Sequence, residues 1–127
     1  MSKANIFNQH HEQYDEWFQK HHDMYRAELT ALKSMIVMHG AGLEIGVGSG
    51  KFAVPLGITT GVEPSVEMAK KAARQGIEVY NAVAEQLPFN NDTFDFAIMV
   101  TTLCFVDDPQ KSICEAYRVI KPDGFCI

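Results

Sequence analysis

The chain has 127 residues, of which 46% are hydrophobic and 21% are charged, and its formal net charge is −5. This length and composition predict one folded domain with a buried core, and the acidic balance argues against nucleic acid and anionic membranes, which need a basic protein surface. No apolar run is long enough to span a bilayer, and the first residues lack the apolar core of a secretory signal, so the cytoplasm is the expected location.

Residues 12–38 carry apolar side chains at intervals of three and four positions, which is the spacing of one helix face. Gly40 ends the pattern, and the sequence leaves open whether it forms one helix or two. Residues 1–40 are therefore predicted to be a helical segment that precedes the sheet. Two histidine pairs, at 10–11 and 21–22, would lie about three helical turns apart, which is too far to share a metal ion, so no metal site is expected.

A glycine-rich turn follows the first predicted strand. Gly42 to Ile45 is a short, mostly apolar run, and glycines occupy alternate positions from Gly46 to Gly50. Because glycine permits positive φ and leaves no Cβ in the way, this pattern indicates a buried parallel strand that ends where the backbone approaches a ligand. The helix that opens after the turn would direct unpaired amide groups at an anionic part of that ligand.

A second apolar run, residues 58–62, ends in Glu63. An acid at the tip of the neighbouring strand is the position from which a doubly wound sheet holds the hydroxyls of a ribose. The alternative for Glu63 is a solvated residue at a strand end. Together with the glycine turn, Glu63 predicts a ligand that contains a nucleoside.

The spacing of the glycines narrows the class of ligand. A dinucleotide fingerprint would need a third glycine where this chain has Lys51. A phosphate-binding P-loop would need one more residue before its Gly-Lys pair, and a hydroxyl where this chain has Phe52. The remaining pattern, E-x-G-x-G-x-G over residues 44–50, resembles the first motif of the class I S-adenosylmethionine-dependent methyltransferases.

The rest of the chain alternates helices and strands. Ser65 is a helix N-cap, Gly76 a helix end, and Asp108 with Pro109 a further helix start. The other expected elements are a brief helix at 51–56, strands at 77–80 and 94–100, a turn at 121–124 and a fifth strand from 125. This order predicts an α/β fold with a doubly wound, Rossmann-like parallel sheet.

Five segments resemble the successive signature segments of the small-molecule class I methyltransferases, namely LEIGVGSG, GVEPS, AEQLPF, FDFAIMV and EAYRVIKPDGF. The resemblance implies that residues 41–127 form the S-adenosylmethionine-binding domain and that residues 1–40 could serve as its lid. It also implies a sheet of seven strands, of which this chain holds about five, so the domain is expected to be C-terminally incomplete. The open edge of the fifth strand would invite another chain, which suggests a homo-oligomer.

The resemblance also implies roles for individual residues. Those that it places at the cofactor are Glu44, Gly46, Gly48 and Gly50 at the methionine end, Glu63 at the ribose, and Pro64, Ser65, Met68, Ala84 and Glu85 around the adenine. Those that it places beneath the sulfonium and the substrate are Thr101, Thr102 and Phe105. The aromatic side chains that could close the lid are Tyr14, Trp17 and Phe18, for which simple packing on the domain is the alternative.

The implied activity moves a methyl group from S-adenosylmethionine to a small-molecule acceptor and leaves S-adenosylhomocysteine. No catalytic residue is assigned, because an activated methyl group mainly needs a positioned acceptor. Val83 departs from the family, which usually has an acid there for the adenine amino group. This departure and the incomplete sheet leave a catalytically inactive module, which binds the cofactor or a partner, as the alternative. A nicotinamide-dependent oxidoreductase is disfavoured by Lys51 and by the later segments.

Overall fold

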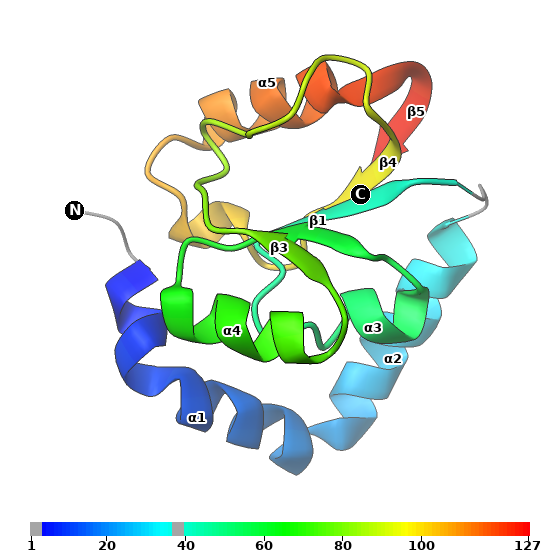
Figure 1. The fold of residues 1–127 in the computed structure, drawn as a ribbon. Helices are drawn as coiled ribbons and strands as arrows, with labels where there is room; N and C mark the ends of the chain where they lie inside the picture. Colours follow the sequence, from blue (N-terminus) through cyan, green and yellow to red (C-terminus); the bar gives the residue numbers. More distant parts are fainter. Residues whose placement is uncertain (1–3, 37–39) are drawn as a thin grey trace.

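A five-stranded parallel sheet forms the centre of the protein, as seen in a computed structural model that describes residues 4–36 and 40–127. The strands follow the order β3-β2-β1-β4-β5 (Figure 1). Their bounds are Gly42–Ile45 for β1, Thr60–Val62 for β2, Glu78–Tyr80 for β3, Phe94–Ile98 for β4 and Ile120–Cys126 for β5. The chain moves outward from β1 in one direction and from β4 in the other, so the topological switch point lies between β1 and β4. The predicted α/β, Rossmann-like fold is confirmed.

Helices cover both faces of this sheet. The helices α3 (Ala53–Leu56) and α4 (Val66–Arg74) lie on one face, and α5 (Pro109–Val119) lies on the other (Figure 1). A short 3₁₀ helix, η1 (Leu103–Phe105), precedes α5. The predicted caps are confirmed, because the Ser65 side chain accepts from Met68 N and the Asp108 side chain accepts from Lys111 N. These local hydrogen bonds fix where α4 and α5 begin.

The N-terminal segment folds into two helices, α1 (Ala4–Lys20) and α2 (His22–Met35). α1 begins before the predicted residue 12, and non-helical backbone angles at His10 kink it. Phe18 of α1 and Leu32 of α2 bury their side chains with Phe52 at the start of α3. This small core attaches both helices to the glycine turn side of the domain, beneath α3 and α4 in Figure 1. In the described ranges, no helix combines the length and apolar character needed to cross a membrane.

Two hydrophobic clusters hold the sheet between its helices, because a central parallel strand presents apolar side chains to both faces. Leu43 and Ile45 point to the α5 side, where they pack with Ala116. Phe96 and Ile98 belong to the cluster on the α3 and α4 side. The four residues of β1 are all buried. The buried centre of the sheet therefore ends at the glycine turn.

The prediction for the last strand was partly wrong. Residues 121–124 were expected to form a turn before a strand that starts at 125, yet β5 already begins at Ile120. Ile120 pairs with Phe94 and Phe125 pairs with Phe96, so residues 121–124 bulge out opposite Asp95. Lys121 Nζ donates to Asp95 Oδ1 at 3.2 Å, and a Cβ at Gly124 would lie 2.4 Å from Asp95 O. The close contact with β4 explains how a turn-like sequence is held inside a strand.

Candidate functional site

A pocket opens at the carboxyl ends of β1, β2 and β4, the edge where open α/β sheets bind ligands. It brings together predicted residues from distant segments of the chain, namely Tyr14, Gly46, Gly48, Glu63, Pro64, Met68, Ala84, Glu85, Thr101, Thr102 and Phe105. Among the described residues, five predicted ones are not part of its lining, namely Trp17, Phe18, Glu44, Gly50 and Ser65. The remaining lining residues were not predicted, and they are Phe7, Val62, Val83, Val100, Val106 and Asp107.

The three glycines of the turn all have positive φ, of 75° at Gly46, 58° at Gly48 and 92° at Gly50. A Cβ added at Gly46 would lie 2.5 Å from Thr102 Oγ1, so this glycine permits the close approach of the chain after β4. A Cβ at Gly48 would lie 3.4 Å from Met68 Cε and 3.8 Å from the Tyr14 hydroxyl. A Cβ at Gly48 would therefore make ordinary van der Waals contacts with these two side chains in the wall of the pocket.

The amide groups of the three glycines already have protein acceptors, unlike the free amides expected at this turn. Gly46 N donates to Val62 O at 2.8 Å, Gly48 N donates to Glu63 Oε1 at 2.9 Å, and Gly50 N donates to Val47 O at 3.0 Å. The glycines thus serve the site through their backbone angles and their missing side chains. Any anionic part of a ligand would need a different donor.

Glu63 joins the glycine turn to α4. Its side chain is only 6% exposed, which excludes the alternative of a solvated strand end. One carboxylate oxygen accepts from Gly48 N, and the other accepts from Ser65 N at 2.8 Å. Burial raises the pKa of Glu63, and the two amide hydrogen bonds oppose that rise. Each oxygen keeps a second lone pair for a ligand hydroxyl.

Glu44 is a buried acid at the base of the turn, with 1% of its surface exposed. Among the described residues, its Oε1 atom has no hydrogen-bond partner. Burial raises the pKa of Glu44 well above its usual range, the amide of Ala53 opposes this rise, and the charge of Glu63 adds to it. The Oε1 atom is therefore an unpaired hydrogen-bond acceptor beneath the glycine turn.

Besides the predicted cap that Ser65 forms, the side chains of Ser65 and Glu85 have hydrogen-bond partners that the sequence did not predict. Ser65 is fully buried, caps α4, and donates from Oγ to Asn8 Oδ1 at 2.6 Å. Glu85 Oε2 accepts from the amides of Asp107 at 2.9 Å and Asp108 at 3.0 Å while Glu85 lines the pocket. Both side chains therefore help to shape the site, and their expected contacts with adenine stay predictions.

The segment after β4 has an unusual backbone at the floor of the pocket. Thr101 has a positive φ of 52°, which a β-branched residue rarely adopts. The next residue, Thr102, donates from Oγ1 to Ile45 O at 3.1 Å and so ties this segment to the end of β1. The backbone is therefore forced into a sharp exit between β4 and η1.

α1 lies across the pocket and contributes two residues to its lining. Phe7 and Phe105 meet edge to face with ring centroids 4.9 Å apart, and Tyr14 is the second pocket residue of α1. Helical spacing places Tyr14 and Phe18 on the same helix face as Phe7. If the predicted helix had been extended toward residue 4, this spacing would have identified Phe7 as a pocket residue. Phe18 instead packs in the small core, while Trp17 is 41% exposed and stacks on His21.

Comparison with known proteins identifies close relatives. A family model described as a methyltransferase domain matches residues 43–127. An uncharacterized protein of Methanocaldococcus jannaschii is 48% identical over 120 residues, which cover 94% of this chain and 58% of that protein. A ubiquinone/menaquinone biosynthesis C-methyltransferase of Desulfotalea psychrophila is 35% identical over 100 residues, which cover 69% of this chain and 41% of that enzyme.

A solved structure shares the whole arrangement. It is a Thermotoga maritima protein described as an S-adenosylmethionine-dependent methyltransferase, possible histamine N-methyltransferase. The two structures superpose with a TM-score of 0.93 at 48% identity, over 96% of this chain and 58% of that chain. This chain thus spans 58% of the length of both the Methanocaldococcus jannaschii protein and the Thermotoga maritima protein. With its matching domain and fold, the chain belongs to the class I S-adenosylmethionine-dependent methyltransferase family.

Proposed function

We propose that the chain binds S-adenosylmethionine in the pocket above β1, β2 and β4 and takes part in methyl transfer to a small-molecule acceptor. The observation that carries this proposal is the buried Glu63 carboxylate, which lines the pocket and is fixed by two amides beside a glycine turn. Such an acid is suited to a pair of ribose hydroxyls. The cofactor itself follows from the family.

The residues present fit the chemical parts of this cofactor. Glu63 would hold the ribose hydroxyls, and Pro64 and Met68 would offer apolar surface to the adenine beside Ala84. Gly48 lines the pocket without a side chain and would let the methionine part approach the backbone of the turn. Glu44, with its orphaned oxygen, would balance the positive charge of the ammonium group.

The work left to the protein is mainly positioning. When bound, the cofactor supplies an activated methyl group on a sulfonium. Thr101 and Phe105 line the far side of the pocket and would orient the acceptor, while Phe7 would exclude water from above. Holding two reacting groups in line, without a strong base, can supply much of the rate enhancement. This role in positioning agrees with the expectation that methyl transfer needs no dedicated catalytic residue.

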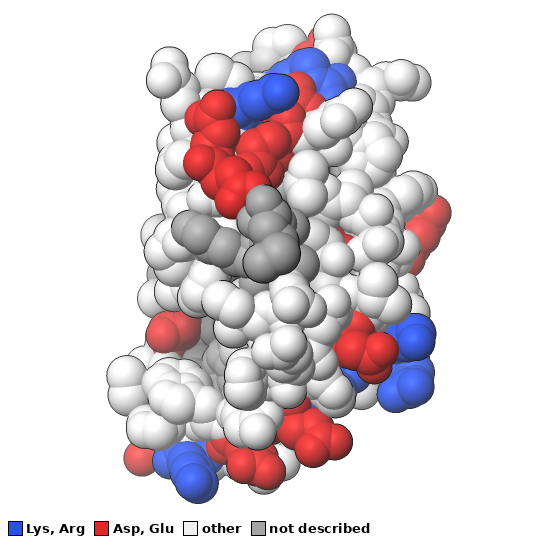
Figure 2. Space-filling model, turned by 90° about the vertical axis from the view of Figure 1, so that its left-hand side faces the viewer, with Lys and Arg blue, Asp and Glu red and all other residues white. Residues whose placement is uncertain are grey.

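The lining supports an acceptor that is small and carries no negative charge. Among the described lining residues there is no Lys, Arg or His, whereas Glu63, Glu85 and Asp107 are acids. On the face that holds the start of α1, the basic side chains are few and lie among acidic ones (Figure 2). This arrangement does not favour a nucleic-acid substrate, and an amine or a neutral aromatic compound would suit the aromatic walls.

Thermal unfolding tests the cofactor assignment. The purified chain is heated alone and with S-adenosylmethionine, S-adenosylhomocysteine or NAD. A ligand at about 100 times its dissociation constant should stabilise the fold by roughly 2.7 kcal/mol, which raises Tm by several degrees. We expect this shift with the two adenosyl-sulfur ligands only, and its loss in Glu63→Ala, with Glu12→Ala on the exposed side of α1 as the control.

Other outcomes would overturn the proposal. Stabilisation by NAD alone would favour the oxidoreductase, and no shift with any ligand would reject cofactor binding by this chain. Cofactor binding without methyl transfer to any acceptor, in a full-length relative that shares the pocket, would favour the inactive binding module.

A further inference from the structure

The segment between β3 and β4 forms one wall of the pocket, although it contains neither a helix nor a strand. All residues of this wall segment, 81–93, are described, and Val83, Ala84 and Glu85 line the pocket. The segment runs alongside α5 before it enters β4 (Figure 1). Without a helix or a sheet ladder, the buried backbone groups of such a segment depend on other partners.

Two side chains of α5, Glu115 and Arg118, hold the middle of the wall segment. Glu115 Oε2 accepts from Leu87 N at 2.8 Å, and Arg118 Nη2 donates to Leu87 O at 3.1 Å. Arg118 Nη1 donates to Phe89 O at 2.8 Å and to Asn91 Oδ1 at 3.0 Å. One ion pair therefore satisfies both backbone groups of Leu87 and also binds two later residues of the segment.

Glu115 and Arg118 also hold each other. Arg118 Nε donates to Glu115 Oε1 at 2.6 Å and Nη2 donates to Oε2 at 2.9 Å, a two-point contact that orients the guanidinium plane. The hydrogen bond from Arg118 lowers the pKa of Glu115, so the pair stays charged at neutral pH. The planar guanidinium serves a carboxylate and several carbonyl groups at once, which the ammonium group of a lysine is not shaped to do.

The contacts of the pair lie next to the pocket-lining part of the wall segment. Ala84 and Leu87 are buried in the same hydrophobic cluster as Ala116 of α5. Leu87 comes two residues after Glu85, whose side chain accepts from two amides just before α5. The wall segment is thus attached near both ends of α5, and the place of Leu87 decides where the pocket-lining residues lie.

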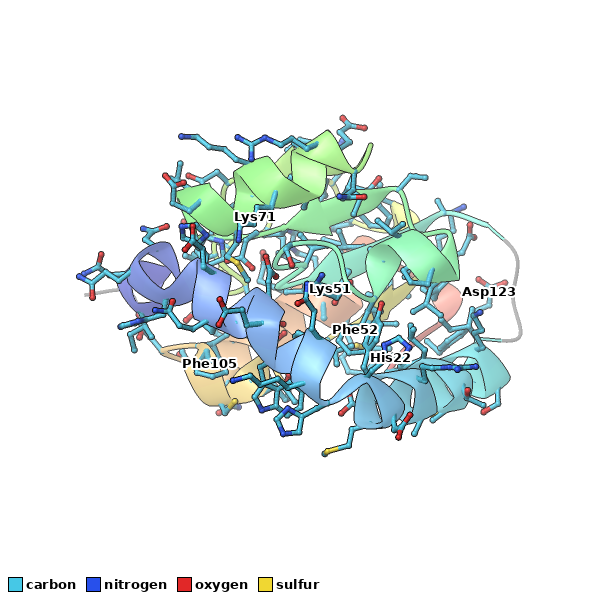
Figure 3. The ribbon with its side chains drawn as sticks, turned by 90° about the horizontal axis from the view of Figure 1, so that it is seen from below. His22, Lys51, Phe52, Lys71, Phe105 and Asp123 are labelled. Atoms are coloured by element: carbon cyan, nitrogen blue, oxygen red, sulfur yellow. The ribbon has the colours of Figure 1, made fainter. Side chains whose placement is uncertain are left out.

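The pair itself stands away from the pocket, whose described lining includes neither Glu115 nor Arg118. Arg118 lies in the last turn of α5, about 15 Å along the helix axis from its start. In Figure 3, Phe105, which precedes α5, and Asp123, which follows it, lie at opposite sides of the molecule. The pair therefore acts on the pocket through the wall segment.

We propose that Glu115 and Arg118 are positioning residues, which hold the wall segment where the adenine of the cofactor would bind. The proposal rests on the proposed function, which puts the adenine beside Ala84. Without Arg118, the carbonyl groups of Leu87 and Phe89 lose their partners, and rearranged forms that expose them to water become competitive. Only a fraction of the molecules then has a complete pocket, and the apparent affinity falls by that fraction.

The test compares Arg118→Ala with Arg74→Ala, which removes an exposed arginine from the last turn of α4. Two ligands are titrated by calorimetry, S-adenosylhomocysteine, which carries the adenine, and S-ribosylhomocysteine, which lacks it. If one molecule in about ten keeps the wall in place, Arg118→Ala weakens binding of S-adenosylhomocysteine about tenfold and leaves S-ribosylhomocysteine unaffected. Arg118→Lys, which keeps the charge beside Glu115, should recover part of this loss. Arg74→Ala should keep both affinities.

Hydrogen exchange of the unliganded proteins reports on the wall segment itself. We expect the amides of residues 82–87 to exchange faster in Arg118→Ala than in the wild type, because the side chain that holds this segment is gone. The amides of β1 should keep their rates, and Arg74→Ala should match the wild type throughout.

Unchanged affinity of Arg118→Ala for S-adenosylhomocysteine would overturn the positioning role. An equal loss for both ligands would also overturn it, because the whole fold rather than the adenine wall would then be weakened. If Arg118→Ala does not fold, Arg118→Lys takes its place in both comparisons, and the same outcomes decide. A wild-type chain that binds neither ligand would reject the proposed function, whereas unchanged exchange of residues 82–87 would reject this inference by itself.

Discussion

Thr101 adopts a left-handed backbone conformation that is costly for a β-branched side chain, at the point where β4 meets the pocket. Strain of this kind amounts to about 1–3 kcal/mol and is concentrated at functional sites. Asn tolerates the left-handed region much better than Thr. We therefore expect Thr101→Asn to raise the free energy of unfolding by about 1 kcal/mol in urea titrations.

The same exchange at an exposed threonine provides the control for Thr101. Thr59 lies before β2 and does not have positive φ. Thr59→Asn should leave the stability within about 0.5 kcal/mol of the wild type, as most surface substitutions do. A loss of stability in Thr101→Asn, or an equal gain in Thr59→Asn, would show that backbone strain is not the cause.

Glu44 should make the stability of the unliganded protein depend on pH. The unfolded chain releases its proton near pH 4.3, and the folded protein holds it to a higher pH because burial raises the pKa of this acid. Between these two pKa values the folded state binds more protons, so the free energy of unfolding falls as pH rises. Glu44→Gln removes this titration.

We expect Glu44→Gln to be more stable than the wild type at pH 8, by about 1–3 kcal/mol, and to match it near pH 4. The measurement is urea denaturation across this pH range. Glu12→Gln, on an exposed residue of α1, is the control and should stay within about 0.5 kcal/mol of the wild type at pH 8. A variant that is less stable at pH 8 would show that the buried carboxylate stabilises the unliganded fold.

The roles that could be predicted are those of residues whose hydrogen-bond partners lie close in the sequence. The caps Ser65 and Asp108 were predictable, because an N-cap bonds to an amide three residues away. The pairing of Glu63 with Gly48 N joins residues fifteen positions apart, and that of Glu85 with Asp107 N joins residues twenty-two positions apart. Such bonds exist only once the sheet has placed the segments side by side.

At the level of elements, α1 is held across the pocket by a side chain that no local pattern indicates. Asn8 Oδ1 accepts from Ser65 Oγ at 2.6 Å and from Glu67 N at 3.3 Å, so α1 supplements the cap of α4. We expect Asn8→Ala to loosen α1 and to speed its amide hydrogen exchange by about 5- to 30-fold, the equivalent of 1–2 kcal/mol.

Hydrogen exchange in β1 should stay unchanged in Asn8→Ala, because the centre of the sheet does not depend on α1. The control is Asn5→Ala, which replaces an exposed asparagine of the same helix. Equal effects of the two substitutions would mean that helix propensity, rather than the hydrogen bonds of Asn8, sets the exchange of α1.

The strands were predicted closely because central parallel strands are apolar on both faces, and β4 shows this most clearly in its Phe94 to Ile98 run. Residues 1–40 were predicted to be a helical segment, but the helical pattern was traced only from residue 12 because residues 4–11 are mostly polar. Contacts with α4 and η1 hold this first part of α1. β5 was misjudged because Pro122 and Gly124 are typical turn residues, and only the pairing with β4 extends them into a strand.

At the scale of the whole molecule, we expect two copies of the chain to associate through the sheet edge at β5. β5 is the last strand on its side, and α5, which packs beside it, leaves Ile113 39% and Tyr117 64% exposed. An apolar helix face next to an open strand edge is a surface that a second copy of the chain can cover. Pro122 lacks an N–H and blocks part of the edge, so the helix face should supply much of the contact.

We expect sedimentation velocity to show a dimer at micromolar concentration, and Tyr117→Lys to shift it to monomer by placing a charge in the apolar contact. Val54→Lys is the matched control, since Val54 is a similarly exposed apolar residue on α3, on the opposite face of the sheet. A monomeric wild type would reject self-association through β5 and α5. Dissociation by both variants would reject the location, because a charge on the α3 side has no reason to disturb a contact on the α5 side.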